Sequence, residues 1–202
     1  MKVRRPRRKA EETREDILRT GETLFREQGI AKSSIADIAH VLNMSPANVF
    51  KHFHSKSALV DAICDRHVNH MIGRFNTFDE PVPAPERLTL VVRKLMEAHL
   101  RDIRENPYFL EMIFVMSETD LPSGRHYKSL LEGLFYDLIR KGAEDGVYHC
   151  KDPGTAGRHV AAAFASVLHP VFLAAADEME LRERCAGLCG LVNAALQNPL
   201  EK

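Results

Sequence analysis

Residues 33–56 have the sequence SSIADIAHVLNMSPANVFKHFHSK, and this stretch decides the fold of the chain. Ser34 can cap a first short helix, because Asp37 follows three positions later in a variant of the capping box. The apolar residues that come next recur at helical spacing: Ile35, Ile38, Ala39 and Leu42. We therefore predict a short helix with one buried face.

A turn and a second short helix follow. Asn43 lies where a residue that tolerates left-handed backbone is needed, and Ser45-Pro46 supplies a cap and a proline at the first helical position. Val49 and Phe53 should face inward. The residues left to face outward, as contacts for base edges and phosphates, are Ala47, Asn48, Lys51 and His52. Two capped helices and a turn of this length are typical of a helix-turn-helix, which predicts a protein that reads DNA.

The rest of the chain also predicts helices, because no run has the alternation and turn chemistry of a β-hairpin. A helix at about 13–28 completes a three-helix head, and Ser55 caps a connecting helix that ends near residue 75. Further helices are predicted at about 86–105, 108–117, 125–144, 153–176 and 179–198, with a kink at Pro170. The predicted fold is all-α, with about nine helices in a head and a larger body.

Charged residues are unevenly distributed along the chain. The 202 residues hold 28 Lys and Arg and 28 Asp and Glu, so the formal net charge is zero. Residues 1–56 have 12 basic against 7 acidic residues, and residues 57–202 have 16 against 21. This split is expected when one end alone attracts phosphate. The basic residues of 1–10 form either a flexible arm that contacts DNA or a disordered, solubilising tail.

The first third of the chain resembles the DNA-binding domain of the TetR family of bacterial transcriptional regulators. The matching residues are TREDIL at 13–18, Leu24-Phe25, Gly29, Ser33-Ser34, Asp37-Ile38-Ala39, FKHF at 50–53 and SKSAL at 55–59. The resemblance implies a transcription regulator, most often a repressor, that binds a palindromic DNA operator as a homodimer. It also implies release from DNA by a small, mostly apolar effector.

Carried over by position, the resemblance implies a set of DNA-contacting residues. They are Ser33, Ser34, Ser45, Pro46, Ala47, Asn48, Phe50, Lys51, His52 and Lys56. Ala36, Asn43 and Phe50 depart from the arginine, glycine and tyrosine that relatives commonly carry, so the operator sequence is not predicted. The implied organisation is a basic arm at 1–10, a DNA-binding domain at 11–56 with its motif at about 33–52, and an effector-binding and dimerisation domain at 57–202.

The last two predicted helices are rich in small residues, which permit close helix approach. They include Ala161–Ala163, Ala165, Ala186, Gly187, Gly190, Ala194 and Ala195. In the resembling family these helices form a four-helix dimer interface, so we expect a homodimer. The alternative is that the alanines reflect helix propensity in a monomeric core.

Apolar stripes in the body predict an effector pocket, although such stripes also form plain core. Histidines and a tyrosine could orient the effector by hydrogen bonds. The candidate lining residues are His67, Met71, His99, Phe109, Met112, Ile113, Met116, Tyr127, Leu131, Phe135, Phe164, Leu168, His169 and Phe172.

Two other kinds of sensor remain open. Cys64, His67 and His70 follow one another at spacings of three and could form part of a metal site, although no fourth ligand is marked. Cys185 and Cys189, one helical turn apart, could respond to redox conditions, although buried packing is the simpler interpretation.

Other classes of protein are disfavoured. No phosphate loop, nucleophile elbow or spaced pair of catalytic carboxylates is present, so we expect neither an enzyme nor a cofactor. A helical scaffold that does not bind DNA is the further alternative. The most apolar stretch, 160–176, is too short to span a membrane and contains His169-Pro170. Without a signal-peptide core or lipidation motif, we expect the protein in the cytoplasm, without membrane contact.

Overall fold

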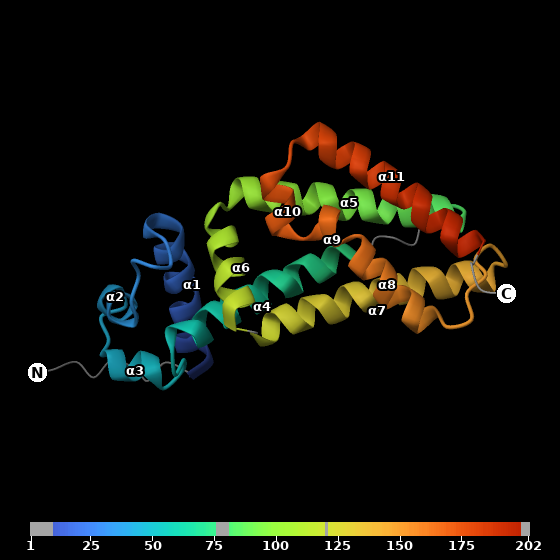
Figure 1. The fold of residues 1–202 in the computed structure, drawn as a ribbon. Helices are drawn as coiled ribbons and strands as arrows, with labels where there is room; N and C mark the ends of the chain where they lie inside the picture. The colour runs from blue at the N-terminus through green and yellow to red at the C-terminus, as the bar shows by residue number, and fades with distance from the viewer. Residues whose placement is uncertain (1–9, 76–80, 120, 199–202) are drawn as a thin grey trace, which may run out of the picture.

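The computed structural model describes the backbone of residues 10–75, 81–119 and 121–198, and the side chains of 10–70, 81–114 and 121–198. All regular secondary structure in these ranges is α-helical, which confirms the all-α prediction (Figure 1). The described residues form eleven helices: α1 (Ala10–Gln28), α2 (Ile35–Val41), α3 (Pro46–Phe50), α4 (Lys56–Phe75), α5 (Ala84–Glu105), α6 (Tyr108–Thr119), α7 (Pro122–Glu144), α8 (Pro153–Ala163), α9 (Ala165–Leu168), α10 (Pro170–Ala175) and α11 (Glu178–Gln197).

Local side-chain chemistry sets the bounds of α2 and α3. The Ser34 hydroxyl accepts from the Asp37 backbone N–H at 3.1 Å, and the Asp37 carboxylate accepts from the Ser34 backbone N–H at 2.8 Å. Asn43 has a φ of 50°, in the left-handed region where an Asn is tolerated. The Ser45 hydroxyl then accepts from the Asn48 backbone N–H at 3.3 Å. The predicted capping box, turn and second cap are confirmed.

The predicted helix at 153–176 is divided into α8, α9 and α10, which accounts for eleven helices instead of about nine. Pro170 lacks a backbone N–H, and His169 before it is extended, with φ −78° and ψ 125°. The predicted kink is therefore a complete break. A second break, at Phe164 between α8 and α9, has no proline and was not predicted.

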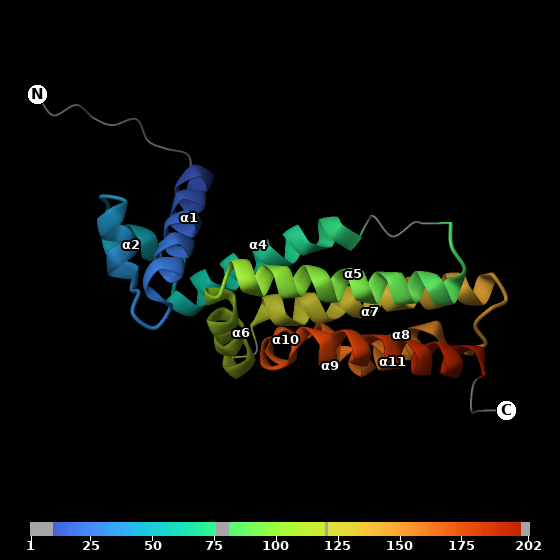
Figure 2. The same ribbon diagram turned by 90° about the horizontal axis from the view of Figure 1, so that it is seen from above.

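Two hydrophobic clusters organise the molecule. One fills the head and extends along α4 to Cys64 and into α6 through Tyr108, Phe109 and Met112. The other lies among α5, α7, α8, α9, α10 and α11. Helix α6 lies between the head and the long body helices in both views (Figures 1 and 2). The head core is therefore completed by a helix that the sequence assigned to the body.

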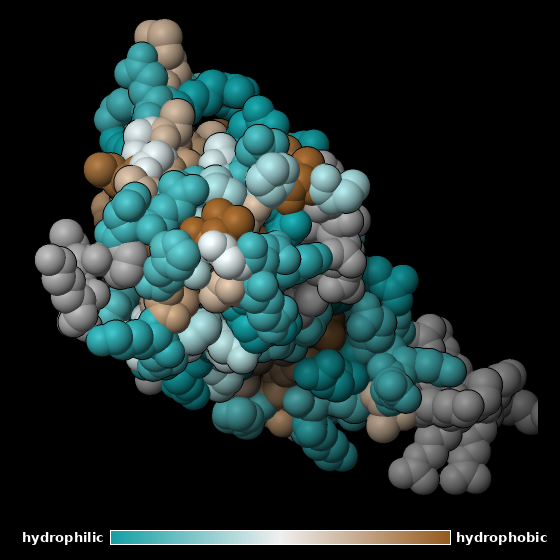
Figure 3. All heavy atoms as spheres, turned by 90° about the vertical axis from the view of Figure 1, so that its right-hand side faces the viewer, coloured by the Kyte–Doolittle hydropathy of each residue, from teal (hydrophilic) through white to brown (hydrophobic). Residues whose placement is uncertain are grey.

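The end of the molecule opposite the head is largely hydrophilic, with hydrophobic residues in small separate patches (Figure 3). Among the described helices, none combines the length and the apolar composition that crossing a membrane requires.

A glycine allows α7 and α8 to approach closely. A Cβ atom built on Gly157 of α8 would lie 2.9 Å from the backbone nitrogen of Tyr136 on α7. Real Cβ atoms do not approach backbone atoms so closely, so a side chain here would force the two helices apart.

We predict that Gly157→Ala lowers the free energy of unfolding by about 1–3 kcal/mol, because the added methyl overpacks the α7–α8 contact. Urea denaturation measures this change. The matched control is Gly133→Ala, at a helical glycine of α7 with open space around it. That substitution should stabilise the protein by up to about 1 kcal/mol through helix propensity. Equal effects of the two substitutions would contradict the packing argument.

Candidate nucleic-acid interface and effector pocket

The outer surface of the head is formed by α2, α3 and the turn between them, on the side away from the body (Figure 1). The residues predicted to contact DNA that are exposed there are Ser34, Ser45, Pro46, Ala47, Phe50 and Lys51, while Asn48, His52 and Lys56 are half-buried. Phe50 is 48% exposed although it is a large apolar side chain. Nine of the ten predicted residues therefore present at least part of a side chain to solvent.

The tenth residue, Ser33, is 3% exposed. Its hydroxyl donates to the Gly29 carbonyl at 2.7 Å and accepts from the Gln28 side chain at 3.3 Å. Ser33 thus closes the end of α1 from inside the head. The neighbouring Ser34 is exposed, but its hydroxyl donates to the Asp37 carboxylate at 2.6 Å. Sequence position alone did not distinguish these two serines.

Two cations border this surface. Lys56 begins α4, and its ammonium nitrogen lies 3.5 Å from the Ala31 carbonyl of the α1–α2 connection. The Arg14 guanidinium of α1 lies 4.8 Å from the centre of the Phe53 ring. Both side chains are held at the head while their charge remains near solvent.

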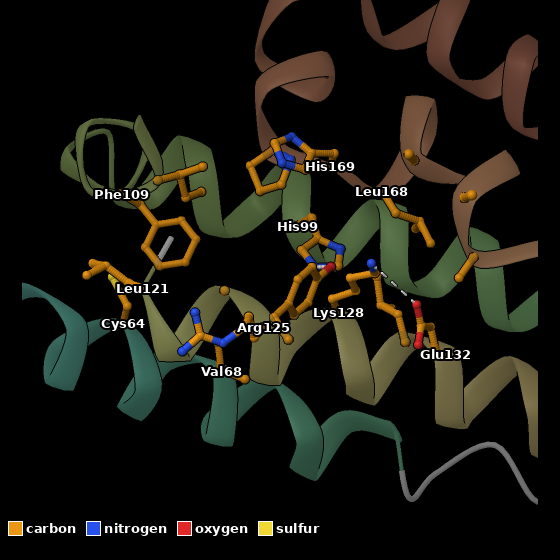
Figure 4. Close-up of a pocket in the computed structure, with 18 of the residues that line it drawn as sticks. Cys64, Val68, His99, Phe109, Leu121, Arg125, Lys128, Glu132, Leu168 and His169 are labelled. Atoms are coloured by element: carbon orange, nitrogen blue, oxygen red, sulfur yellow. Dashed lines mark hydrogen bonds and ion pairs between the residues drawn. The ribbon is translucent and has the colours of Figure 1, made fainter. Parts of the chain in front are cut away.

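A cavity of about 840 Å³ lies in the body, between α4, α5, α6, α7 and the broken helices α8 to α10 (Figure 4). Half of the predicted pocket residues line it. They are His99, Phe109, Ile113, Tyr127, Leu131, Leu168 and His169. The cavity lies within the size range of small-molecule sites, and its wall is mostly apolar.

The other predicted pocket residues lie elsewhere or outside the described side chains. Phe135 and Phe164 stack on each other with ring centres 5.4 Å apart, and Met112 is fully buried in the head core. Phe172 is 51% exposed and His67 faces the head. Met71 and Met116 are outside the described side chains. The five described residues are therefore absent from the cavity wall, and the prediction for Met71 and Met116 stays untested.

Several lining residues were missed. They are Cys64, Val68, Leu121, Gly124, Arg125, Lys128, Glu132, Arg158, Ala161, Ala162, Ala165 and Pro170. On α7, the spacing could have identified further lining residues, because Gly124, Lys128 and Leu131 recur at four and three residues and share one helix face. That face also carries charged residues, so it does not form an apolar stripe. Lys128 and Glu132 form an ion pair at 3.9 Å, which Figure 4 shows along α7.

The body and the head are joined by the carboxylate of Glu22 on α1. It accepts hydrogen bonds from the Tyr108 hydroxyl at 2.9 Å and the His67 ring at 3.0 Å, and it pairs with Arg66. The His67 hydrogen bond is the main cause that lowers the pKa of Glu22 to about 2, with further lowering by Tyr108 and by the charges of His67 and Arg66, against the opposing effect of burial. This carboxylate thus links α1 to α4 and α6.

Helix α6 makes a second polar contact with the head. The Glu111 carboxylate accepts from the backbone N–H groups of Ile30 and Ala31, at 3.0 and 2.8 Å. Because Phe109 and Ile113 of the same helix line the cavity, α6 touches both the head and the pocket. Helix α4 also touches both the pocket and the head. Cys64 and Val68 line the cavity, and Arg66 bonds to Glu22 of the head.

Of the two alternative sensor sites, the metal site lacks the expected geometry, and the cysteine pair shows the buried packing that was the simpler interpretation. Cys64 is 2% exposed, His67 bonds Glu22, and His70 is exposed, so the three do not converge. Among the described residues, no group of three or more His, Cys, Asp or Glu side chains is arranged to hold a metal ion. Cys185 and Cys189 are both buried as free thiols, and the hydrogen bond with Cys185, together with burial, raises the pKa of Cys189.

Comparison with known proteins gives two family matches. Residues 17–63 match a model described as bacterial regulatory proteins of the tetR family, and residues 84–189 match one for the C-terminal domain of tetracycline repressor-like proteins. The chain is 31% identical to the HTH-type transcriptional regulator TtgR of Pseudomonas putida over 110 residues, which are 51% of this chain and 52% of that protein. The match thus spans about half the length of this curated relative.

Solved structures share the fold. Thermus thermophilus FadR in complex with lauroyl-CoA superposes with a TM-score of 0.60 at 21% identity, over 94% of this chain and 96% of that one. RolR in complex with resorcinol gives a TM-score of 0.62 at 16% identity, over 96% and 97%. At these identities the likeness concerns the fold alone.

We predict that Glu22→Gln destabilises the protein by roughly 3 kcal/mol at pH 7, the free-energy equivalent of the lowered carboxyl pKa. A carboxyl whose pKa is lower in the folded state contributes stability above its unfolded value of 4.5, and this contribution is lost as the pH falls from 4.5 towards 2. Urea unfolding at pH 7, 4 and 3 should therefore show a difference between wild type and variant that shrinks with acid.

The control for this measurement is Glu27→Gln, an exposed position on the same helix. It should change stability by less than about 0.5 kcal/mol at each pH. A difference between wild type and Glu22→Gln that stays constant with pH would rule out the ionised carboxylate as its source.

Proposed function

Since this chain belongs to the TetR family of bacterial regulatory proteins, we propose that it is a sequence-specific, DNA-binding transcriptional regulator that acts as a ligand-responsive repressor. The observation that carries the proposal is the pair of capped helices α2 and α3, exposed at one end of the molecule (Figure 1). The family consists of transcriptional regulators and not of enzymes, so catalysis is no longer an alternative.

In the proposed complex, α3 lies in the major groove of operator DNA. Ala47 and Asn48 are at the start of this helix, where short side chains let the backbone approach base edges. Lys51 and Lys56 contact phosphates on either side and fix the register of the head. Ser33 supports the surface from inside, through its hydrogen bond to Gly29.

Two copies of the chain pair in this proposal through the exposed face of α11. Leu191 and Met179 are 71% and 70% exposed, and the face between them carries Glu183 and the small residues Ala186, Gly187 and Gly190. Cβ atoms on the two glycines would meet nothing within 4 Å, so a second helix has room to approach. Symmetric pairing matches the two halves of a palindromic operator.

The 840 Å³ cavity is the proposed effector site. Its position supports this role, because α4 and α6 each carry lining residues on one side and head contacts on the other. An effector that binds one arrangement of α4 and α6 more tightly would shift the spacing of the two heads and weaken operator binding. We place this regulator in the cytoplasm, where operator DNA is accessible.

The direct test is a mobility-shift assay with the DNA upstream of the protein's own gene, at several salt concentrations and with unrelated duplex as competitor. A specific regulator should give a salt-dependent shift that survives the competitor. Failure to shift this DNA or any fragment selected from the genome would contradict the proposal.

We predict that Lys51→Ala and Lys56→Ala each weaken binding and reduce the slope of log affinity against log salt by about one, because each removes one phosphate contact. The control is Lys151→Ala, an exposed lysine between α7 and α8. It should leave affinity and slope unchanged. If the head variants behave like Lys151→Ala, these lysines do not contact DNA.

We predict that Leu191→Glu raises the dissociation constant of the dimer at least about a hundredfold, because pairing would bury an unpaired carboxylate. Analytical ultracentrifugation measures the oligomeric state. Val41→Glu, which alters an exposed apolar residue of the head, should leave that state unchanged. A dimer that survives Leu191→Glu would exclude this face of α11 as the interface.

A further inference from the structure

Two hydrogen bonds in series end at the pocket wall. The Nδ1 atom of His99 lies 2.7 Å from the backbone oxygen of Leu95, one turn earlier on α5. A carbonyl oxygen only accepts, so Nδ1 carries a ring hydrogen. His99 is 2% exposed, and burial favours the uncharged ring. The Nε2 atom of the uncharged ring therefore carries no hydrogen, and it accepts from the Tyr127 hydroxyl at 2.8 Å.

These two hydrogen bonds determine whether Tyr127 acts as a donor or an acceptor towards a bound molecule. Its single hydroxyl hydrogen is committed to His99, so the oxygen presents only lone pairs. Burial raises the pKa of Tyr127, which keeps the group a hydroxyl and not a phenolate. Since Tyr127 and His99 both line the cavity, a ligand O–H gains a hydrogen bond at this oxygen. An ether or carbonyl oxygen in the same place gains none.

His169 offers the complementary group. Its Nδ1 atom accepts from the Val171 backbone N–H at 3.4 Å, where it caps α10. Partial burial lowers the pKa of this ring, so the uncharged form with hydrogen on Nε2 is favoured. His169 and His99 both face the same space in Figure 4. The wall around them includes Phe109, Leu131 and Leu168.

We propose that the effector is a mostly apolar molecule that carries a hydroxyl group, a phenol or an alcohol, and that its O–H donates to the Tyr127 oxygen. The ligand oxygen keeps lone pairs that can accept from His169. The cavity volume accommodates a ring with an alkyl chain. This inference rests on the proposed function, since it concerns the same effector site.

The test compares 4-hexylphenol with its methyl ether, 4-hexylanisole, by isothermal titration calorimetry on the full chain. The ether keeps the acceptor and the apolar body, and it replaces the donor hydrogen with a methyl group. We expect the phenol to bind about tenfold more tightly, although the ether is the more apolar molecule. Tyr127→Phe should reduce this preference to below threefold, because the Tyr127 oxygen is gone and the His99 ring behind it is 2% exposed, too buried to replace it as an acceptor.

Tyr136→Phe is the matched control, because Tyr136 lies on the same helix, is 40% exposed and does not line the cavity. It should keep the tenfold preference. Thermal unfolding checks that Tyr127→Phe is folded, and the comparison of the two ligands on wild type needs no variant. Three outcomes would each overturn the assignment: equal affinities for phenol and ether, no binding of the phenol, or a preference for the phenol that survives Tyr127→Phe.

A separate mobility-shift assay with and without 4-hexylphenol distinguishes this inference from the proposed function. Selective binding of the phenol without an effect on operator affinity would support the ligand class and refute the effector role. Release of operator by phenol and ether alike would support the effector role and overturn the hydroxyl assignment.

Discussion

The position of the head relative to the body depends on one partly buried carboxylate. Glu22 of α1 accepts from His67 and pairs with Arg66 on α4, and it accepts from Tyr108 on α6. Apolar contacts around it, such as those of Ile63 and Met112, bring the helices together without specifying direction. Hydrogen bonds to a charged group are directional and stronger than neutral ones, so they set the rotation of α4 and α6 against α1. Any movement of α6 must rearrange these contacts.

The local structure of the head could be predicted because its signals lie within a few residues. Ser34 with Asp37, and Ser45 with Pro46, each determine a helix start through contacts no more than three residues apart. The break at Pro170 had a similar local cause. The break at Phe164 has no proline or other local signal, and the contact seen there, the stacking of Phe164 on Phe135 of α7, is one that no nearby residue specifies. Sequence periodicity therefore predicted the helices but not every break within them.

The pocket was predicted only in part because apolar spacing identifies a buried face without identifying what covers it. Leu131 and Phe135 are one turn apart on α7, yet the first lines the cavity and the second fills the core. On α4, Cys64 and Val68 share the pocket face at a spacing of four residues, whereas His67 points to the head. Which face meets a cavity is decided by the packing of distant helices.

The walls of the cavity belong to two different hydrophobic cores, and this has a consequence for engineering a biosensor from the protein. Cys64 and Phe109 belong to the head core and to the cavity wall at once, whereas Leu131 and Leu168 belong to the cavity wall and the body core. Under the proposed function, substitutions on α4 or α6 chosen to admit a new inducer would also alter the head, and so would combine non-additively with changes in the proposed DNA-contacting surface. Libraries directed at α7 and α9 would instead vary the wall of the proposed effector site without substituting any residue of the head core.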